Sequence, residues 1–133
     1  MEALLRWPPE VSVSNRREVI QWWESRRLNF NTYVGVIGVV SWLLVLTAGS
    51  AAIKPGVDFE EPFAMIVGPF YYCLFANVCY SFGWIVDAAF FRRAPRVRLY
   101  KFGMLFSVAL TALPGIWAVV AWITTLITGQ KLD

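Results

Sequence analysis

Residues 28–53 read LNFNTYVGVIGVVSWLLVLTAGSAAI and contain no Asp, Glu, Lys or Arg. Two further charge-free runs follow, from Pro62 to Val86 and from Phe102 to Gln130. Because a helix rises about 1.5 Å per residue, each run is long enough to cross a hydrocarbon core about 30 Å thick. We therefore predict an all-α integral membrane protein with three transmembrane helices.

The charges between these runs divide the rest of the chain into short segments. The predicted segments are a cytoplasmic or interfacial amphipathic segment at 1–27, transmembrane helices at 28–53, 62–91 and 102–128, an acidic outer loop at 54–61, a basic cytoplasmic loop at 92–101 and an outer tail at 129–133. Asn15 and Glu18 have the spacing of a helix N-cap and its capping-box partner. From Arg16 to Arg27, tryptophans mix with charged residues, which is typical of a short interfacial helix that leads into the first span.

The distribution of basic residues predicts the orientation. Ten of the twelve lie in the segments 1–27 and 92–101, whereas the first loop and the tail carry one each. Basic segments are retained in the cytoplasm, so we expect the N-terminus inside and the C-terminus outside. A cleaved signal peptide is the alternative for the first run, since Ala48 and Ser50 suit a cleavage site. However, a charged segment of 27 residues precedes that run, which is longer than the apolar core of a signal peptide.

The composition argues against an enzyme. Charged residues make up 16% of the chain, whereas soluble domains contain about 25%. The chain has no His, which removes the usual general base and the commonest metal ligand. Cys73 and Cys79 lie six residues apart, about 240° around a helix, and therefore point away from each other. With no catalytic motif in the sequence, we expect no enzymatic activity, no metal and no cofactor.

A polar stripe marks the second span. At 100° per residue, six residues fall within about one third of the helix circumference. They are Cys73, Asn77, Tyr80, Ser81, Trp84 and Asp87. Asn77 is near the middle of the run, so its amide requires a partner on another helix, in another copy of the chain or in a water-filled cavity. For Asp87 we expect an ion pair near the cytoplasmic end, and Arg26, Arg27 and Arg92 are the candidate partners, with Asn29 and Asn31 nearby.

The third span carries small residues at four-residue steps, which favours close helix packing. This helix-packing seam consists of Gly103, Ser107, Thr111 and Gly115. The first span offers Gly35, Gly38 and Ser41 as a weaker counterpart. Pro114 is expected to kink the third helix.

The basic loop satisfies the predicted orientation and also suits contact with anionic lipid headgroups. The residues expected to make that contact are Arg92, Arg93, Arg96 and Arg98. The patch is short and lacks a fold around it, so no nucleic-acid partner is expected.

Two strings in the chain support a resemblance. They are WWESRRLNFN at Trp22 to Asn31 and NVCYSFGW at Asn77 to Trp84. Together they resemble a group of small, uncharacterised bacterial inner-membrane proteins that share a W-E-x-R-R-L-x-[FY]-N start and an N-x-x-Y-x-x-G-W second span. The resemblance implies a multi-pass protein of the bacterial inner membrane, and it implies no activity.

These observations favour a non-enzymatic helix-packing subunit of a homo-oligomer or of a larger membrane complex. Its expected partners are anionic lipids, further copies of itself and other membrane subunits. One alternative is an oligomeric channel or transporter with a polar pathway along the second span, lined by Asn77, Tyr80 and Asp87. A further alternative is a membrane-permeabilising effector.

Overall fold

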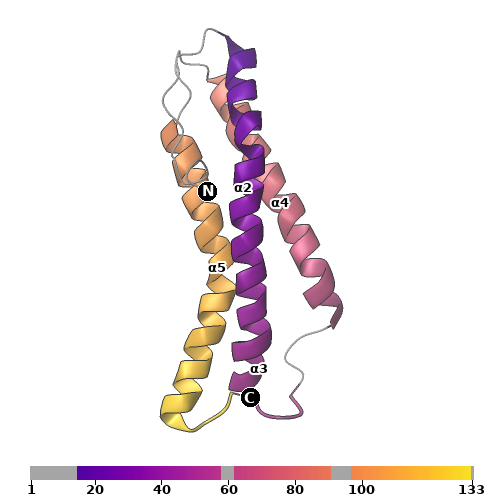
Figure 1. Cartoon of the computed structure of the whole chain (residues 1–133), viewed down its shortest axis with the longest axis vertical. Coiled ribbons are helices and arrows are strands. Elements are labelled where there is room, and N and C mark those ends of the chain that lie inside the picture. The colour runs from indigo at the N-terminus through magenta and orange to yellow at the C-terminus, as the bar shows by residue number, and fades with distance from the viewer. Residues whose placement is uncertain (1–14, 58–61, 91–96, 133) are drawn as a thin grey trace.

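The computed structural model describes residues 15–57, 62–90 and 97–132, which are dominated by three long helices (Figure 1). Helix α2 spans Arg16–Leu44 and continues through the π-helical segment η1, Val45–Gly49, into α3, Ser50–Ala52. Helix α4 spans Pro62–Ala89, and α5 spans Val97–Thr128. Three stretches are long and apolar enough to cross a membrane, so the predictions of an all-α fold and of three helices able to span a bilayer are confirmed.

The first helix begins where the sequence predicts a cap. The Asn15 side chain accepts a hydrogen bond from the Glu18 backbone N–H at 3.0 Å and donates one to the Glu18 carboxylate at 3.1 Å. From Arg16 the helix continues without interruption into the predicted first span. Residues 16–27 are therefore the first turns of a long helix rather than a separate one, and their place at a membrane interface stays a prediction.

The far ends of α3 and α5 are tied together by the tail. The Leu132 backbone N–H donates to the Ala52 carbonyl at 3.0 Å, and the Lys54 N–H donates to the Leu132 carbonyl at 3.2 Å. Gly129 adopts a positive φ of 68°, which ends α5 and lets the chain turn toward Ile53. The first and third spans consequently end side by side.

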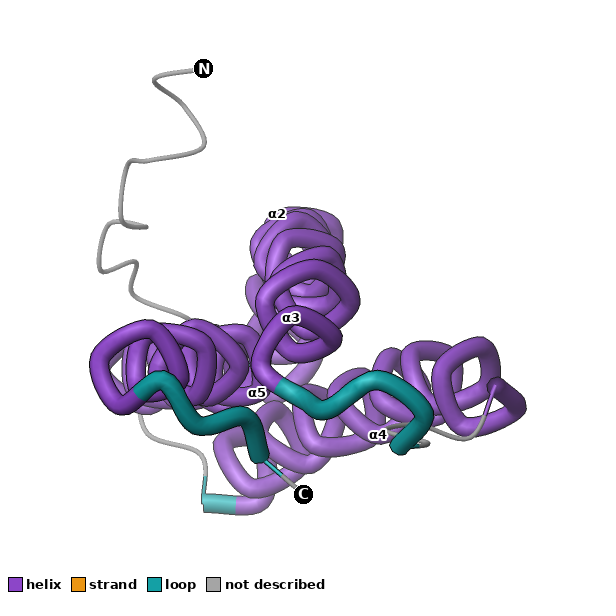
Figure 2. The backbone as a smooth tube through the Cα atoms, turned by 90° about the horizontal axis from the view of Figure 1, so that it is seen from below, coloured by secondary structure: helices purple, strands orange, loops and turns teal. Residues whose placement is uncertain are grey.

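Helices α2 and α5 are parallel neighbours along their length, whereas α4 is antiparallel to both. Figure 2 shows the three helices arranged as a triangle with α2 at one corner, and the N-terminal half of α4 diverges from α2 and α5. The C-terminal half of α4 therefore carries most of its contacts with α2.

The closest approach of α2 and α5 is at Ser41 and Gly115. A Cβ atom on Gly115 would lie only 2.8 Å from the Cα atom of Ser41, so a side chain does not fit there. The Gly115 backbone N–H donates to the Ser41 hydroxyl at 2.9 Å, and Thr111 packs against Gly38. Helix α5 runs past Pro114 to Thr128.

The predicted seam on α5 is split between two neighbours. Thr111 and Gly115 are buried against α2, whereas a Cβ atom on Gly103 would meet no atom within 4 Å. The Ser107 carbonyl accepts a hydrogen bond from Tyr72 of α4 at 3.4 Å. Residues four apart are displaced by about 40° around a helix, so a row of four rotates by about 120° and does not keep facing one neighbour.

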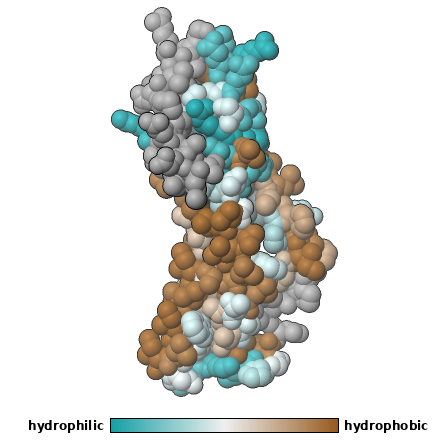
Figure 3. All heavy atoms as spheres, in the orientation of Figure 1, coloured by the Kyte–Doolittle hydropathy of each residue, from teal (hydrophilic) through white to brown (hydrophobic). Residues whose placement is uncertain are grey.

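Exposed apolar side chains cover much of the bundle. Phe70, Trp117 and Ile127 are among the large hydrophobic residues on its surface. In Figure 3 the hydrophobic residues form a broad zone over the middle and lower parts, and hydrophilic residues gather toward the upper end. Such a surface suits contact with lipid tails or with other apolar helices.

Candidate functional site

Trp23 of α2 is held by three residues of α4 that lie on one helix face. Its indole N–H donates to the Asp87 carboxylate at 3.0 Å, and its backbone carbonyl accepts from the Tyr80 hydroxyl at 2.5 Å. Gly83 leaves room for the ring, since a Cβ atom there would lie 3.3 Å from it. The spacing of residues 80, 83 and 87 is the three-and-four pattern of a helix face. This arrangement fixes the register of α4 on α2.

Aromatic rings surround this contact and form the core. The Trp23 ring packs edge to face against Trp22, Tyr80 and Tyr100, with centroids 5.8, 5.4 and 5.6 Å away. Phe30 packs against Tyr80 at 4.7 Å. Trp22 and Trp23 are buried, 7% and 3% exposed. In the structure both side chains join the three helices, because α4 and α5 cover the apolar face of the first turns of α2.

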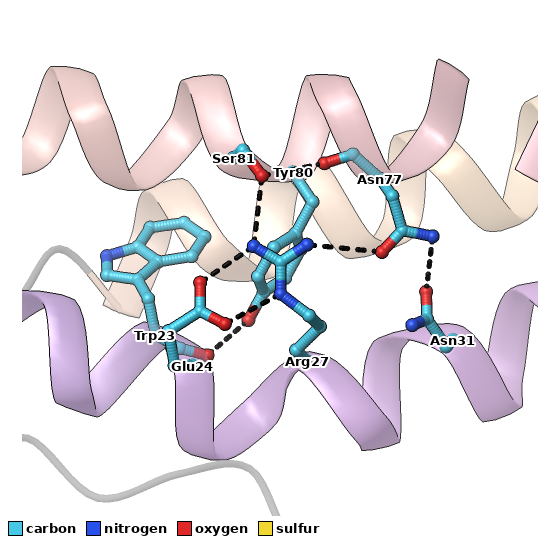
Figure 4. A network of polar contacts seen from close by, with 7 residues as sticks. All are labelled: Trp23, Glu24, Arg27, Asn31, Asn77, Tyr80 and Ser81. Atoms are coloured by element: carbon cyan, nitrogen blue, oxygen red, sulfur yellow. Dashed lines mark hydrogen bonds and ion pairs between the residues drawn. The ribbon is translucent and has the colours of Figure 1, made fainter. Parts of the chain in front are cut away.

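Arg27 organises a second, polar cluster between α2 and α4 (Figure 4). Its guanidinium forms an ion pair with Glu24, with two N···O distances of 2.7 Å. The same group donates to the Asn77 side-chain oxygen at 3.2 Å and to the Ser81 hydroxyl at 2.9 Å. Arg27 therefore neutralises a charge on its own helix while it binds two polar groups of α4. We call Glu24, Arg27, Asn31, Asn77 and Ser81 the Arg27 network.

Asn77 finds its partners on the same chain. Its amide N–H groups donate to the Asn31 side-chain oxygen and to the Cys73 carbonyl, both at 3.0 Å. Of the three kinds of partner that the sequence left open, the structure supplies another helix. Asn77 also lies level with Arg27, where the charge-free run of α2 begins, because α4 crosses α2 at its C-terminal half. Asn77 is near the middle of its own charge-free run, so the sequence alone does not show that it lies level with the start of the run in α2.

Asp87 is buried, 3% exposed, and receives a hydrogen bond from Trp23. Two of the three guanidinium groups proposed as its partners make the contacts that follow. Arg26 donates to the Trp22 carbonyl at 2.6 Å and lies over the Trp22 ring, 4.0 Å from its centroid, whereas Arg27 belongs to the network described above. Arg92, the third candidate, lies outside the described residues. The indole partner was missed because only arginine and asparagine side chains were considered as partners of Asp87.

The predicted polar stripe is thus divided between two clusters. Asn77 and Ser81 belong to the Arg27 network, and Tyr80 and Asp87 hold Trp23. The Cys73 side chain is exposed. The indole N–H of Trp84 is buried, and it has no hydrogen-bond partner within residues 15–57, 62–90 and 97–132.

The Arg27 network reaches the surface of the bundle. The side chains of Arg27 and Glu24 are 28% and 41% exposed, and Asn31 is exposed. Leu28, which follows Arg27, is 76% exposed. Charged and amide groups therefore lie at the surface directly beside apolar side chains.

Other predicted positions are less informative. Arg98 is exposed at the start of α5, and Arg92, Arg93 and Arg96 lie outside the described residues. In the part of the chain that the structure describes, no three Cys, Asp or Glu residues lie close enough to hold a metal ion.

Comparison with known proteins finds no matching family model, no similar curated protein and no similar solved structure.

Proposed function

We propose that this chain is a non-enzymatic subunit of a membrane assembly, either a homo-oligomer or a larger complex. The observation that carries the proposal is the half-exposed Arg27 network at the seam of α2 and α4. Helices α2 and α4 satisfy the network's internal hydrogen bonds but leave Glu24 and Asn31 exposed on one side.

The cost of exposing such groups to lipid supports this proposal. A charged side chain in the hydrocarbon core costs about 2.5–3.5 kcal/mol on insertion scales. Polar groups at membrane depth therefore face water, headgroups or protein. Exposed Leu28 beside the network favours protein, since a partner helix would cover the apolar and polar groups together.

A pair of variants at neighbouring surface positions tests the proposal. Asn31→Leu removes an exposed member of the network, whereas Thr32→Val removes an exposed hydroxyl that bonds to the Leu28 carbonyl of its own helix, at 2.9 Å. We expect the first variant to lower the fraction of assembled chain in native mass measurements and the second to leave it unchanged. If both variants and the unaltered chain assembled to the same extent, the Arg27 network would not be part of the interface.

The channel alternative draws less support. Its pathway requires Asn77, Tyr80 and Asp87 to face a shared polar space, whereas these groups bond to Arg27, to the Trp23 carbonyl and to the Trp23 indole. A membrane-permeabilising effector gains no specific support from these contacts.

For the location we propose the bacterial inner membrane, with the N-terminus in the cytoplasm and the C-terminus outside. The support is the concentration of basic residues in segments 1–27 and 92–101 and the resemblance carried by the two sequence strings. A membrane-impermeant maleimide should label Gln130→Cys in intact cells and spare Arg98→Cys, in a chain with both native cysteines replaced by Ala. If Arg98→Cys were labelled and Gln130→Cys were spared, the orientation would be the opposite of the proposed one.

A further inference from the structure

Arg26 and Arg27 are adjacent on α2, but their guanidinium groups differ in their partners. In Arg27, the edge formed by Nε and Nη2 binds the two carboxylate oxygens of Glu24, both at 2.7 Å (Figure 4). In Arg26, the donor to the described residues is Nη1, which bonds to the Trp22 carbonyl at 2.6 Å and to the Ser25 hydroxyl at 2.9 Å. The Nε–Nη2 edge of Arg26 therefore has no acceptor within the described residues.

This edge of Arg26 is held in place and reaches the surface. The two bonds of Nη1 fix one end of the guanidinium, whose central carbon lies 4.0 Å from the centroid of the Trp22 ring. That ring is itself buried and packs against Tyr100 at 5.7 Å. In the described part of the chain, the buried side-chain donors without a partner are the indole N–H groups of Trp22 and Trp84, so Nε and Nη2 of Arg26 are accessible.

A fixed pair of parallel N–H donors suits an oxyanion that accepts both at once. We propose that the Nε–Nη2 edge of Arg26 binds the phosphate group of a membrane phospholipid. Arg27 shows the same edge occupied by a carboxylate from its own helix, whereas no carboxylate forms an ion pair with Arg26 within residues 15–57, 62–90 and 97–132.

The acidic residues of the described part favour a lipid phosphate over a carboxylate from a second copy. Glu18 and Glu24 already accept hydrogen bonds from neighbouring side chains of their own chain. The third, Asp87, is only 3% exposed. A second copy would therefore have to break one of these contacts in order to supply a carboxylate to Arg26 from the described residues.

The surface beside Arg26 favours a phosphate that carries an apolar tail. The charge-free run 28–53 follows directly on the same helix. At steps of seven, eleven and fourteen residues from Arg26, which keep to one face of a helix, it presents Tyr33, Ile37 and Val40. Val40 is 49% exposed and the other two are half-buried. A phospholipid matches both the guanidinium and this apolar face, whereas inorganic phosphate matches only the guanidinium.

Two substitutions separate the geometry of the edge from its charge. Arg26→Gln removes both, and Arg26→Lys keeps the charge but not the paired donors. Arg17→Gln, at an exposed arginine of the same helix, is the control. Each chain is extracted in mild detergent from phosphatidylglycerol vesicles, and native mass spectrometry counts the phospholipids that it retains. We expect Arg26→Gln to lower retention several-fold, Arg26→Lys to lower it partly and Arg17→Gln to leave it unchanged.

A second measurement uses the unaltered chain and does not depend on the variants folding. Solid-state NMR of isotope-labelled arginine nitrogens in phosphatidylglycerol vesicles detects guanidinium groups beside phosphorus. The Nε signal of Arg26 should be dephased by phosphorus, and that of Arg27 should not, because Glu24 occupies its edge. The absence of dephasing at Arg26, or equal lipid retention by Arg26→Gln and Arg17→Gln, would overturn the proposal.

The same signal distinguishes the sources of the anion. In vesicles of digalactosyl diacylglycerol, a lipid without phosphate, inorganic phosphate in the buffer should leave the Arg26 signal unchanged. Dephasing there to the same extent would overturn the proposal in favour of a free phosphate. Loss of assembly in Arg26→Gln with unchanged lipid retention would overturn it in favour of a partner's carboxylate. Neither result touches the proposed membrane assembly, which rests on the Arg27 network.

Discussion

Trp23 connects α2 to α4 through both its backbone and its side chain. Its carbonyl accepts from Tyr80, its indole N–H donates to Asp87, and its ring lies on Gly83. A buried carboxylate is costly unless donors surround it, so the indole N–H stabilises Asp87 in the core.

Trp23→Phe keeps an aromatic ring and removes the N–H. Because Asp87 is buried and would lose a donor, we expect the free energy of unfolding to fall by about 1–3 kcal/mol. Unfolding in mixed micelles of SDS and a mild detergent, followed by circular dichroism, measures this change. Trp117→Phe, at an exposed tryptophan, is the control and should have little effect. Equal stability of the two variants would mean that the Trp23–Asp87 bond contributes nothing measurable.

Gly115→Ala tests the contact between α2 and α5. The added Cβ atom would lie 2.8 Å from the Ser41 backbone, so the helices must separate. We expect a loss of about 1–3 kcal/mol in the same unfolding assay. Gly35→Ala adds a methyl group in open space and should be neutral or slightly stabilising, because alanine favours the helix. A neutral Gly115→Ala would contradict the close crossing at Ser41.

At this scale, the sequence predicts the kinds of residue that matter better than their partners. Asn77, Asp87, Thr111 and Gly115 were all selected from helical spacing. The bond from Trp23 to Asp87 joins residues 64 positions apart and depends on the register of α4 on α2. Helical periodicity gives the face of each helix but not that register.

Of the three long helices, α4 packs least against its neighbours. Its C-terminal half is held by Trp23 and by the Arg27 network, and its N-terminal half diverges from α2. By contrast, α2 and α5 contact each other from the aromatic core to the bridge between Ile53 and Leu132. The pair of α2 and α5 therefore forms the more rigid unit.

Asn77→Leu should loosen α4 selectively. The substitution removes the hydrogen bonds to Arg27 and Asn31, whereas the contact of Ser41 with Gly115 is untouched. We expect faster amide hydrogen exchange in α4 and unchanged exchange in residues 38–44 of α2 and 111–118 of α5. Phe75→Leu, at an exposed position on α4, is the matched control. Uniformly faster exchange in all three helices would mean that α4 is not a separable unit.

The helices themselves follow closely from the sequence. Charge-free runs located all three helices that are long and apolar enough to cross a membrane, because such runs suit a hydrocarbon core. The boundaries differ where polar residues remain helical: α2 begins at Arg16, and α5 begins at Val97, five residues before the predicted span. Packing against neighbouring helices stabilises these turns, and a charge count along one helix does not report that packing.

Over the whole molecule, exposed polar side chains are not fully separated from exposed apolar ones. The aromatic core and the bond to Asp87 are buried, but the Arg27 network is open beside exposed Leu28. A partner that covers this seam would complete the separation, and this is the basis for proposing a membrane assembly. The sequence predicts a polar stripe but not its open side, because exposure depends on how all three helices pack.

The native mass of the unaltered chain, extracted from its own membrane in polymer-bounded nanodiscs, tests this account most directly. One chain has a mass of 15.1 kDa. The account predicts a protein mass above that value, either a whole multiple of it or a sum that includes other membrane proteins. A protein mass equal to a single chain, at the concentration found in the native membrane, would contradict it.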